Sequence, residues 1–194
     1  MHITDARALI VAGLALVASP VAAQDMFAEM QEQCSACHAQ ENAAPDAPLL
    51  GGIDERYALL QLVAFREGDR KNEIMNGMVA DFSNDDLRAA AAWVAGLERP
   101  TPPEDPAEVD AGSAEQLASQ HRCNVCHGSD YLGGDQMPPL RNQHQGYLEK
   151  ALLDCKGERR IGDRAAMVEV AQDLSEDEIA TLAAYLSGLP AMAE

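Results

Sequence analysis

The sequence is poor in basic and in aromatic residues. Its 194 residues include 14 Lys and Arg against 32 Asp and Glu, which gives a formal net charge of −18. Nucleic acids and anionic membrane surfaces attract basic patches, so this charge argues against both as partners. Aromatic residues make up only 4% of the chain, although 47% is apolar. We therefore expect a globular protein in which something other than large side chains fills part of the interior.

Long apolar runs are also scarce, and the longest uncharged one, residues 9–18, is about half as long as a membrane-spanning helix. Arg7 precedes it and the small residues Val21 and Ala23 follow it, a pattern typical of a secretory signal peptide. The sequence predicts a signal peptide over residues 1–23, cleaved near Ala23, no stable membrane span, and export to a bacterial periplasm. A short buried helix and an uncleaved anchor are the alternatives.

Four of the five cysteines stand in two copies of one motif, C-x-x-C-H, at residues 34–38 and 123–127. This motif is typical of covalent attachment of c-type haem. Two thiols one helical turn apart reach the two vinyl groups of one porphyrin, and the following histidine binds the iron. The motif residues are Cys34, Cys37 and His38 in the first copy, and Cys123, Cys126 and His127 in the second.

Three other interpretations of a C-x-x-C pair fit less well. A thioredoxin-like redox site needs a βαβ context, and strand signals are nearly absent here. A zinc site made of four cysteines needs no histidine directly after each pair. A disulfide that closes so short a loop contributes little to stability. The sequence therefore predicts two covalently attached haem c groups, each holding one iron.

The chain consists of two copies of one pattern, offset by about 90 residues. Four prolines within residues 100–106 predict an extended linker between them. The predicted domains are residues 24–99 and 107–194. The remaining cysteine, Cys155, is open to interpretation as a haem ligand, a reactive thiol or an intermolecular bridge, but its place opposite Phe65 in the repeat favours a small buried side chain. Other matched pairs are Tyr57 with Tyr147, Arg70 with Arg160, and Trp93 with Tyr185.

Each copy is predicted to be helical, which makes the fold all-α, with two tandem domains. The closing helices have the clearest starts, because Ser83 and Ser175 are each followed three residues later by an acid, as in a capping box. Gly96 and Gly188 are predicted to end these helices. The opening helices are expected over residues 25–37 and 111–126, and the second helices near 56–65 and 145–154.

The sixth ligand of each iron is predicted from the repeat. Met75 lies seven residues before Phe82, and Met167 lies seven before Leu174, so the two methionines occupy equivalent positions ahead of the closing helices. We expect both in a loop. Met78 and Met137 are alternative candidates for the sixth ligand, but neither has a counterpart in the other copy. His121 and His144 also lack one and are expected at the surface. A backbone carbonyl near Pro48 and near Pro138 either accepts the Nδ1 proton of the iron-binding histidine or belongs to a simple turn.

At this point the residues resemble a family, the dihaem class I cytochromes c, and cytochrome c4 most closely. The resemblance covers nearly all of the chain after the predicted signal peptide, and Asn142-Gln143 departs from Gly51-Gly52 of the first copy. It implies two cytochrome c folds, His/Met ligation of both irons and periplasmic electron transfer. It rests on the two C-x-x-C-H motifs, Pro48-x-Leu50-x-Gly52, Tyr57, Met75 with residues 82–87, and Met167 with residues 174–179 and 182–185.

The function predicted from this resemblance is electron shuttling, not catalysis, between a respiratory donor and a terminal oxidase or reductase. The acidic surface predicts redox partners with basic docking faces. The alternatives are the cytochrome subunit of a flavocytochrome c sulfide dehydrogenase, which has a flavoprotein partner, and a dihaem enzyme with one labile axial ligand, such as a peroxidase or a thiosulfate dehydrogenase.

Overall fold

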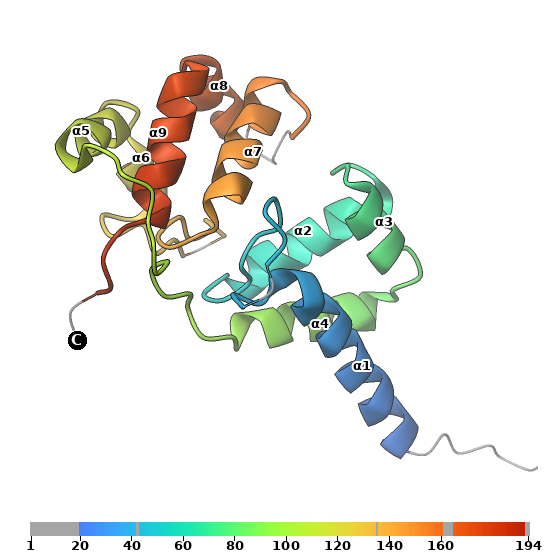
Figure 1. The fold of residues 1–194 in the computed structure, drawn as a ribbon. Helices are drawn as coiled ribbons and strands as arrows, with labels where there is room; N and C mark the ends of the chain where they lie inside the picture. Colours follow the sequence, from blue (N-terminus) through green and yellow to red (C-terminus); the bar gives the residue numbers. More distant parts are fainter. Residues whose placement is uncertain (1–19, 42, 135, 161–164, 193–194) are drawn as a thin grey trace, which may run out of the picture.

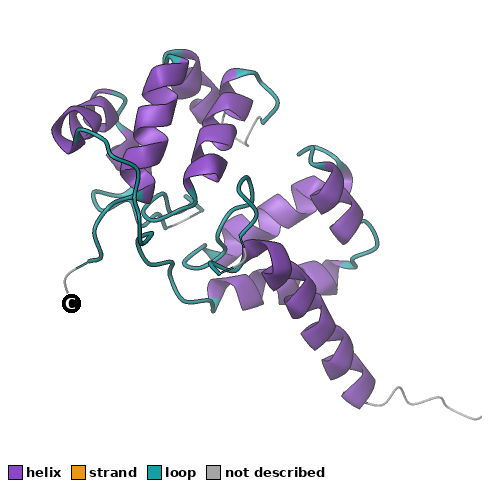
Figure 2. Cartoon of the chain, viewed as in Figure 1, coloured by secondary structure: helices purple, strands orange, loops and turns teal. Residues whose placement is uncertain are grey.

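The computed structural model describes residues 20–41, 43–134, 136–160 and 165–192, with side chains from residue 28 onward. The predicted signal peptide falls mostly outside these residues. Within them the chain is helical and contains no strand, only an isolated bridge between Gly134 and Met137 (Figure 2). The all-α prediction is therefore confirmed. None of the described helices is long and apolar enough to cross a membrane.

The helices follow one another in the same order twice (Figure 1). One body holds α1–α4 and a second holds α5–α9, and we refer to them as the N-terminal and C-terminal halves. A segment without helix connects α4 to α5. The elements are α1 (Pro20–His38), α2 (Glu55–Glu67), α3 (Glu73–Val79), α4 (Asn84–Ala95), α5 (Ala111–Gln120), α6 (Cys123–His127), α7 (Gln145–Lys156), α8 (Ala166–Gln172) and α9 (Glu176–Ser187).

The two opening segments differ. In the N-terminal half α1 runs unbroken from Pro20 through the first motif, so it starts earlier than predicted. In the C-terminal half the predicted helix 111–126 is wrong as a single element. Arg122 adopts a left-handed conformation with φ 56°, which interrupts the helix between α5 and α6. The second motif therefore lies in a short helix of its own.

The closing helices start as predicted. The hydroxyl of Ser83 accepts from the backbone N–H of Asp86 while the Asp86 carboxylate accepts from the N–H of Ser83, and Ser175 and Glu178 form the same pair. Both capping boxes are confirmed. Gly96 and Gly188 follow the last helical residues as expected, but their φ angles are −86° and −89°, so neither stop uses left-handed backbone.

Each half buries its own small core around its closing helix. Leu87 of α4 and Ile179 of α9 are fully buried at equivalent positions. The C-terminal core is the more continuous one, and it includes Leu174, Leu182 and Leu186. Most buried side chains of these cores are Ala, Leu, Val and Ile, and among the described residues only Phe65 and Tyr131 add buried rings, which leaves bulk to be supplied by another group.

Candidate haem sites

The first motif occupies the last turn of α1. Cys34 is half-buried and Cys37 exposed, so the two thiols reach out from the same helix end, and His38 is its last residue. The second motif fills α6, where Cys123 is half-buried and Cys126 exposed. Among the described residues no disulfide joins any of these four thiols, so all four can add to haem vinyl groups.

The two motif histidines make the same hydrogen bond. Nδ1 of His38 lies 2.7 Å from the carbonyl oxygen of Pro48, and Nδ1 of His127 lies 2.8 Å from that of Pro138. A carbonyl oxygen only accepts, so Nδ1 carries the proton and Nε2 is left with a free lone pair. The carbonyl role considered for both prolines is confirmed. These bonds fix the ring orientation and leave Nε2 available as a metal ligand.

Burial favours the neutral form of both histidines. It holds their pKa below the ordinary 6.5, the proline carbonyl opposes this shift, and a positive charge adds to it. That charge is Arg70 at His38 and Arg160 at His127. A neutral imidazole is the form that binds iron, so the donor chemistry of both sites fits haem.

The structure also tests the zinc interpretation. Among the described residues, no three His, Cys, Asp or Glu side chains group in a way that would hold a bare metal ion. A zinc site needs about four such ligands in one place. Each motif instead offers two thiols and one oriented imidazole, a set that suits a porphyrin already carrying its iron.

The predicted loop around each methionine is wrong. Met75 lies in α3 and Met167 in the first turn of α8, and both helices are seven residues long. Met75 is half-buried and packs against the cluster of Phe65, Val79 and Leu87. Met167 is 38% exposed. A short helix holds a side chain more firmly than a loop does, because its backbone hydrogen bonds fix the direction of each Cα–Cβ bond.

Two asparagines missed in the sequence analysis hold α3. The Asn72 side chain accepts from the N–H of Met75 at 2.9 Å and caps the helix. The Asn76 amide donates to the carbonyl of Arg70 at 2.9 Å and to that of Phe65. Asn at the N-cap of a short helix is a signal that could have been found in the sequence. The N-cap of α8, Ala165, makes no side-chain cap bond.

The remaining candidates lie elsewhere. Met78 is 37% exposed at the end of α3, and Met137 belongs to the bridge with Gly134. His121 ends α5 as its C-cap. His144 was expected at the surface, but it is only half-exposed and its Nδ1 is buried with no hydrogen-bond partner among the described residues.

Cys155 is buried within α7, with 6% of its surface exposed, and Phe65 is 7% exposed at the equivalent position of α2. The predicted buried position is confirmed. Burial raises the pKa of its thiol. Both properties oppose a role as a reactive thiol or an intermolecular bridge.

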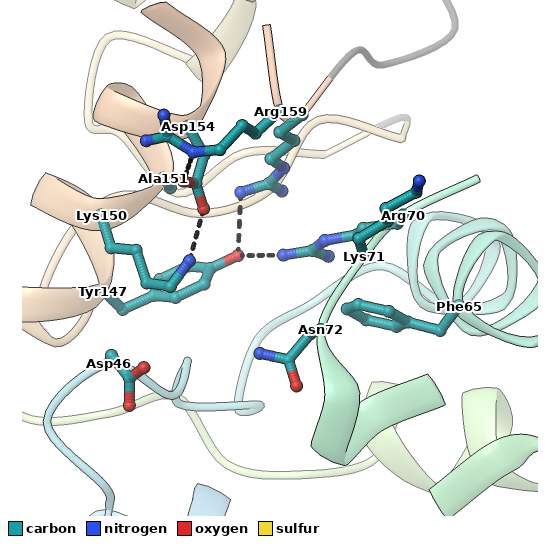
Figure 3. A pocket seen from close by; sticks show the side chains of 11 residues that line it. Asp46, Phe65, Arg70, Lys71, Asn72, Tyr147, Lys150, Ala151, Asp154 and Arg159 are labelled. Atoms are coloured by element: carbon teal, nitrogen blue, oxygen red, sulfur yellow. Dashed lines mark hydrogen bonds and ion pairs between the residues drawn. The ribbon is translucent and has the colours of Figure 1, made fainter. Parts of the chain in front are cut away.

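Two arginines and two tyrosines meet between the halves, a juxtaposition the sequence analysis did not anticipate. Nη2 of Arg160 donates to the hydroxyl of Tyr57 at 2.7 Å, and its Nη1 lies 3.2 Å from the hydroxyl of Tyr147. Arg70 donates to the same Tyr147 hydroxyl at 3.3 Å (Figure 3). Burial raises the pKa of Tyr57. At Tyr147 the charges of Arg160 and Arg70 outweigh burial and lower the pKa to about 8.

Comparison with known proteins places this arrangement. The family model described as Cytochrome c matches residues 111–190. The chain is 32% identical to cytochrome c4 of Pseudomonas aeruginosa, over 91% of this chain and 92% of that protein. The chain belongs to the cytochrome c4 family. Reduced recombinant cytochrome c4 from Pseudomonas stutzeri superposes with a TM-score of 0.73 at 29% identity, covering 85% of this chain and 97% of that one.

A second kind of relative is also present. The chain is 31% identical to a protein of Stutzerimonas stutzeri named thiosulfate dehydrogenase electron acceptor, over 80% of this chain and 78% of that protein. As in cytochrome c4, two helical cytochrome domains carry two covalently bound haem c groups, so the predicted fold and cofactors are confirmed. The chain is an electron carrier rather than an enzyme.

Proposed function

We propose that the protein carries electrons between a respiratory donor and a terminal oxidase or reductase in a bacterial periplasm, after removal of residues 1–23. His38 and Met75 would hold one haem iron, and His127 and Met167 would hold the other. When bound, haem supplies a centre that cycles between ferric and ferrous iron. The proposal also includes two domains, at residues 24–99 and 107–194, joined by a linker at residues 100–106.

One observation supports this function most strongly. Both motif histidines have Nδ1 engaged by a proline carbonyl, at 2.7 and 2.8 Å, so both sites are built in the same way. Two equivalent sites suit two electron-transfer centres better than one catalytic and one transfer centre. With one histidine and one methionine bound to each iron, no position would remain open for a substrate. A thioether ligand raises the reduction potential, as a carrier that feeds an oxidase requires.

The test is the ferric spectrum of the holoprotein. A sulfur-to-iron charge-transfer band with the intensity of two Met-ligated haems is expected. Met75→Ala and Met167→Ala are each expected to remove about half of it, while Met78→Ala leaves it intact. A band of half intensity in the wild-type chain, with the other haem high-spin, would instead support a dihaem enzyme with one labile ligand.

Docking by charge is the second part of the proposal. The net charge of −18 favours partners with basic faces and association that weakens as salt screens the charges. We expect the rate of electron exchange with a basic redox protein to fall steeply between low and physiological ionic strength. A rate independent of salt for every basic partner would contradict this docking mode.

The relative named as a thiosulfate dehydrogenase electron acceptor favours a second candidate, in which the donor is a dehydrogenase for inorganic sulfur compounds. The flavocytochrome c subunit is a related alternative with a flavoprotein donor. Purification from the native cell separates them. Co-purification with a flavoprotein supports the subunit role, while reduction by a thiosulfate-oxidising enzyme in solution supports the acceptor role.

A further inference from the structure

The carbonyl that orients His127 lies in a segment whose backbone is fixed by a neighbouring loop. The ring of Pro138 restricts its own φ angle. Shortly after it, the backbone N–H groups of Leu140 and Arg141 both donate to the carbonyl of Tyr131, at 2.9 and 3.1 Å. Tyr131 is itself buried and adopts left-handed backbone with φ 61°. The position of the Pro138 carbonyl therefore depends on what holds this loop and the residues that follow the proline.

The side chain of Arg141 joins this loop to the chain that follows α9. Its Nε donates to the carbonyl of Asp130 at 2.8 Å, and its Nη1 donates to the carbonyl of Pro190. Hydrogen bonds from a charged donor are stronger than those between neutral groups. Arg141 lies three residues after Pro138, so one side chain ties the segment of the orienting carbonyl to two other parts of the half.

Asn142 fixes the same segment to the end of α9. Its backbone N–H donates to the carbonyl of Leu186 at 2.9 Å, and its side-chain amide donates to the carbonyls of Ser187 at 3.2 Å and Leu189 at 2.6 Å. The last carbonyls of a helix have no partner within the helix, so they need donors from outside. Asn142 is buried, and its three bonds make the end of α9 a fixed support for the segment.

In the N-terminal half, glycines occupy the positions of Arg141 and Asn142, three and four residues after the orienting proline. They are Gly51 and Gly52. Gly52 and Asn142 share left-handed backbone, with φ 75° and 55°, which shifts by one residue the pairing expected from the sequence. A Cβ on Gly51 would collide with the carbonyl oxygen of Glu98, so the chain after α4 packs directly on the glycine backbone. Glycine has no side chain to make the bonds found in the second copy.

We propose that Arg141 and Asn142 are positioning residues that hold the Pro138 carbonyl against Nδ1 of His127. A firm hydrogen bond at Nδ1 makes the imidazole a stronger donor to iron, which favours the ferric state and lowers the reduction potential of that haem. The pair acts on the haem of its own half and leaves the other unchanged. The inference rests on His127 as an iron ligand, which is part of the proposed function, and needs no particular donor or acceptor protein.

The experiment follows the Nδ1 proton of His127 by NMR in the reduced dihaem holoprotein. Asn142→Gly removes the amide and keeps a backbone that glycine adopts freely at φ 55°. Arg141→Met removes the guanidinium. Each variant is expected to speed the exchange of this proton with deuterium about tenfold, because bonds that hold its acceptor are lost. The potential of the same haem, from spectroelectrochemistry, is expected to rise, while the Nδ1 proton and the haem potential at His38 stay as in wild type.

A merely structural role predicts a different pattern. Lower stability of the whole half would speed the exchange of the buried α9 amides, such as those of Leu182 and Ala183, by the same factor as that of His127. Arg159→Met is the matched control, because it removes the same charge from the same half, and Arg159 pairs with Asp154 at 2.8 Å near the end of α7. It is expected to change neither the exchange at His127 nor the potential.

The proposal is overturned by unchanged exchange in either variant, by equal acceleration at the two motif histidines, by acceleration no greater than that of the α9 amides, or by a fall in the potential. Arg141→Lys keeps the charge and one donor group, and it is expected to restore part of the protection. A separate signal tests the proposed function. In wild type, ring protons of His127 shifted far upfield by the porphyrin identify an iron ligand, and their absence would contradict that function rather than this inference.

Discussion

Gln143 binds the main chain of Leu49 through both atoms of its side-chain amide. The N–H of Leu49 donates to Oε1 at 2.6 Å, and Nε2 donates to the Leu49 carbonyl at 2.9 Å. The residues are 94 positions apart, one in each half, and both are buried. The amide thus satisfies two buried backbone groups that lie outside any helix.

Replacement of this glutamine is expected to destabilise the contact between the halves. Gln143→Leu keeps the volume but leaves a buried N–H and a buried carbonyl without partners, which costs about 1–3 kcal/mol. The free energy of unfolding of the holoprotein, from urea titration, measures the loss. Gln172→Leu is the control, because Gln172 is exposed and its side chain bonds only to Glu158 among the described residues. Equal effects of the two variants would show that the bridge does not stabilise the fold.

A cation at equivalent positions of α2 and α7 holds the end of each methionine-bearing segment. Arg66 donates to the carbonyl of Phe82 at 3.0 Å, and Lys156 to the carbonyl of Leu174 at 2.7 Å. Hydrogen bonds from charged donors contribute about 1.5–3 kcal/mol. We expect Lys156→Met to loosen α8, so that the Met167–iron band disappears at a lower urea concentration than global unfolding.

The matched control for this prediction is Arg88→Met. Arg88 pairs with Asp85 at the surface, where both side chains are well exposed, so its loss should change stability by less than about 1 kcal/mol. If Lys156→Met lowers stability while the band persists until global unfolding, the lysine stabilises the half without positioning the ligand.

The holoprotein is expected to have one free thiol, and that thiol is expected to be unreactive. Four cysteines are consumed by haem attachment, and Cys155 is buried with its thiol pKa raised by burial. Alkylation should therefore label no cysteine in the native protein and one in urea. Cys155→Ala is expected to leave the visible spectrum unchanged. Loss of a haem absorption feature in that variant would instead make Cys155 a ligand.

The capping boxes predict that part of the free energy of unfolding is lost in acid. Hydrogen bonds from Ser83 lower the pKa of Asp86, and those from Ser175 lower the pKa of Glu178, relative to ordinary values of 3.8 and 4.5. A carboxylate with a lowered pKa stabilises the fold above its ordinary pKa, and this contribution is lost as the pH falls through the lowered value. Glu178→Gln should therefore make the free energy of unfolding less steep with pH in this acidic range.

Unfolding of wild type and Glu178→Gln by urea at a series of pH values measures this difference. Ser175→Ala removes the other side of the box and should cost about 0.5–2 kcal/mol at neutral pH. The double variant should lose little more than either single one, since both break the same pair. Additive losses would show that the two residues act separately.

Local chemistry made part of this structure predictable. Ser83 and Ser175 predict the starts of their helices because capping depends on residues three apart. The proline carbonyls lie within eleven residues of the histidines that they orient. Cys155 was placed correctly through its match with Phe65. Such features depend on neighbours along the chain, or on the equivalence of the two copies, and both can be read from the sequence.

The contacts between the halves could not be predicted in this way. The repeat paired Tyr57 with Tyr147 and Arg70 with Arg160, but it did not show that the partners are exchanged, because that depends on how two folded bodies meet. Gln143 stood out only as part of a departure from the first copy. The helices around Met75 and Met167 were missed because seven residues carry too weak a periodic signal without their tertiary contacts.

The exchange of arginine partners limits how this cytochrome can be rebuilt. A chimaera that replaces the C-terminal half with a single-haem cytochrome would lose the phenolic acceptor of Arg70 and the guanidinium that Tyr57 accepts from. Even a perfectly folded substitute would leave Arg70 with only its Gln61 hydrogen bond and the Tyr57 hydroxyl without its donor from the other half. Transplanting either module therefore requires grafting a tyrosine and an arginine with it.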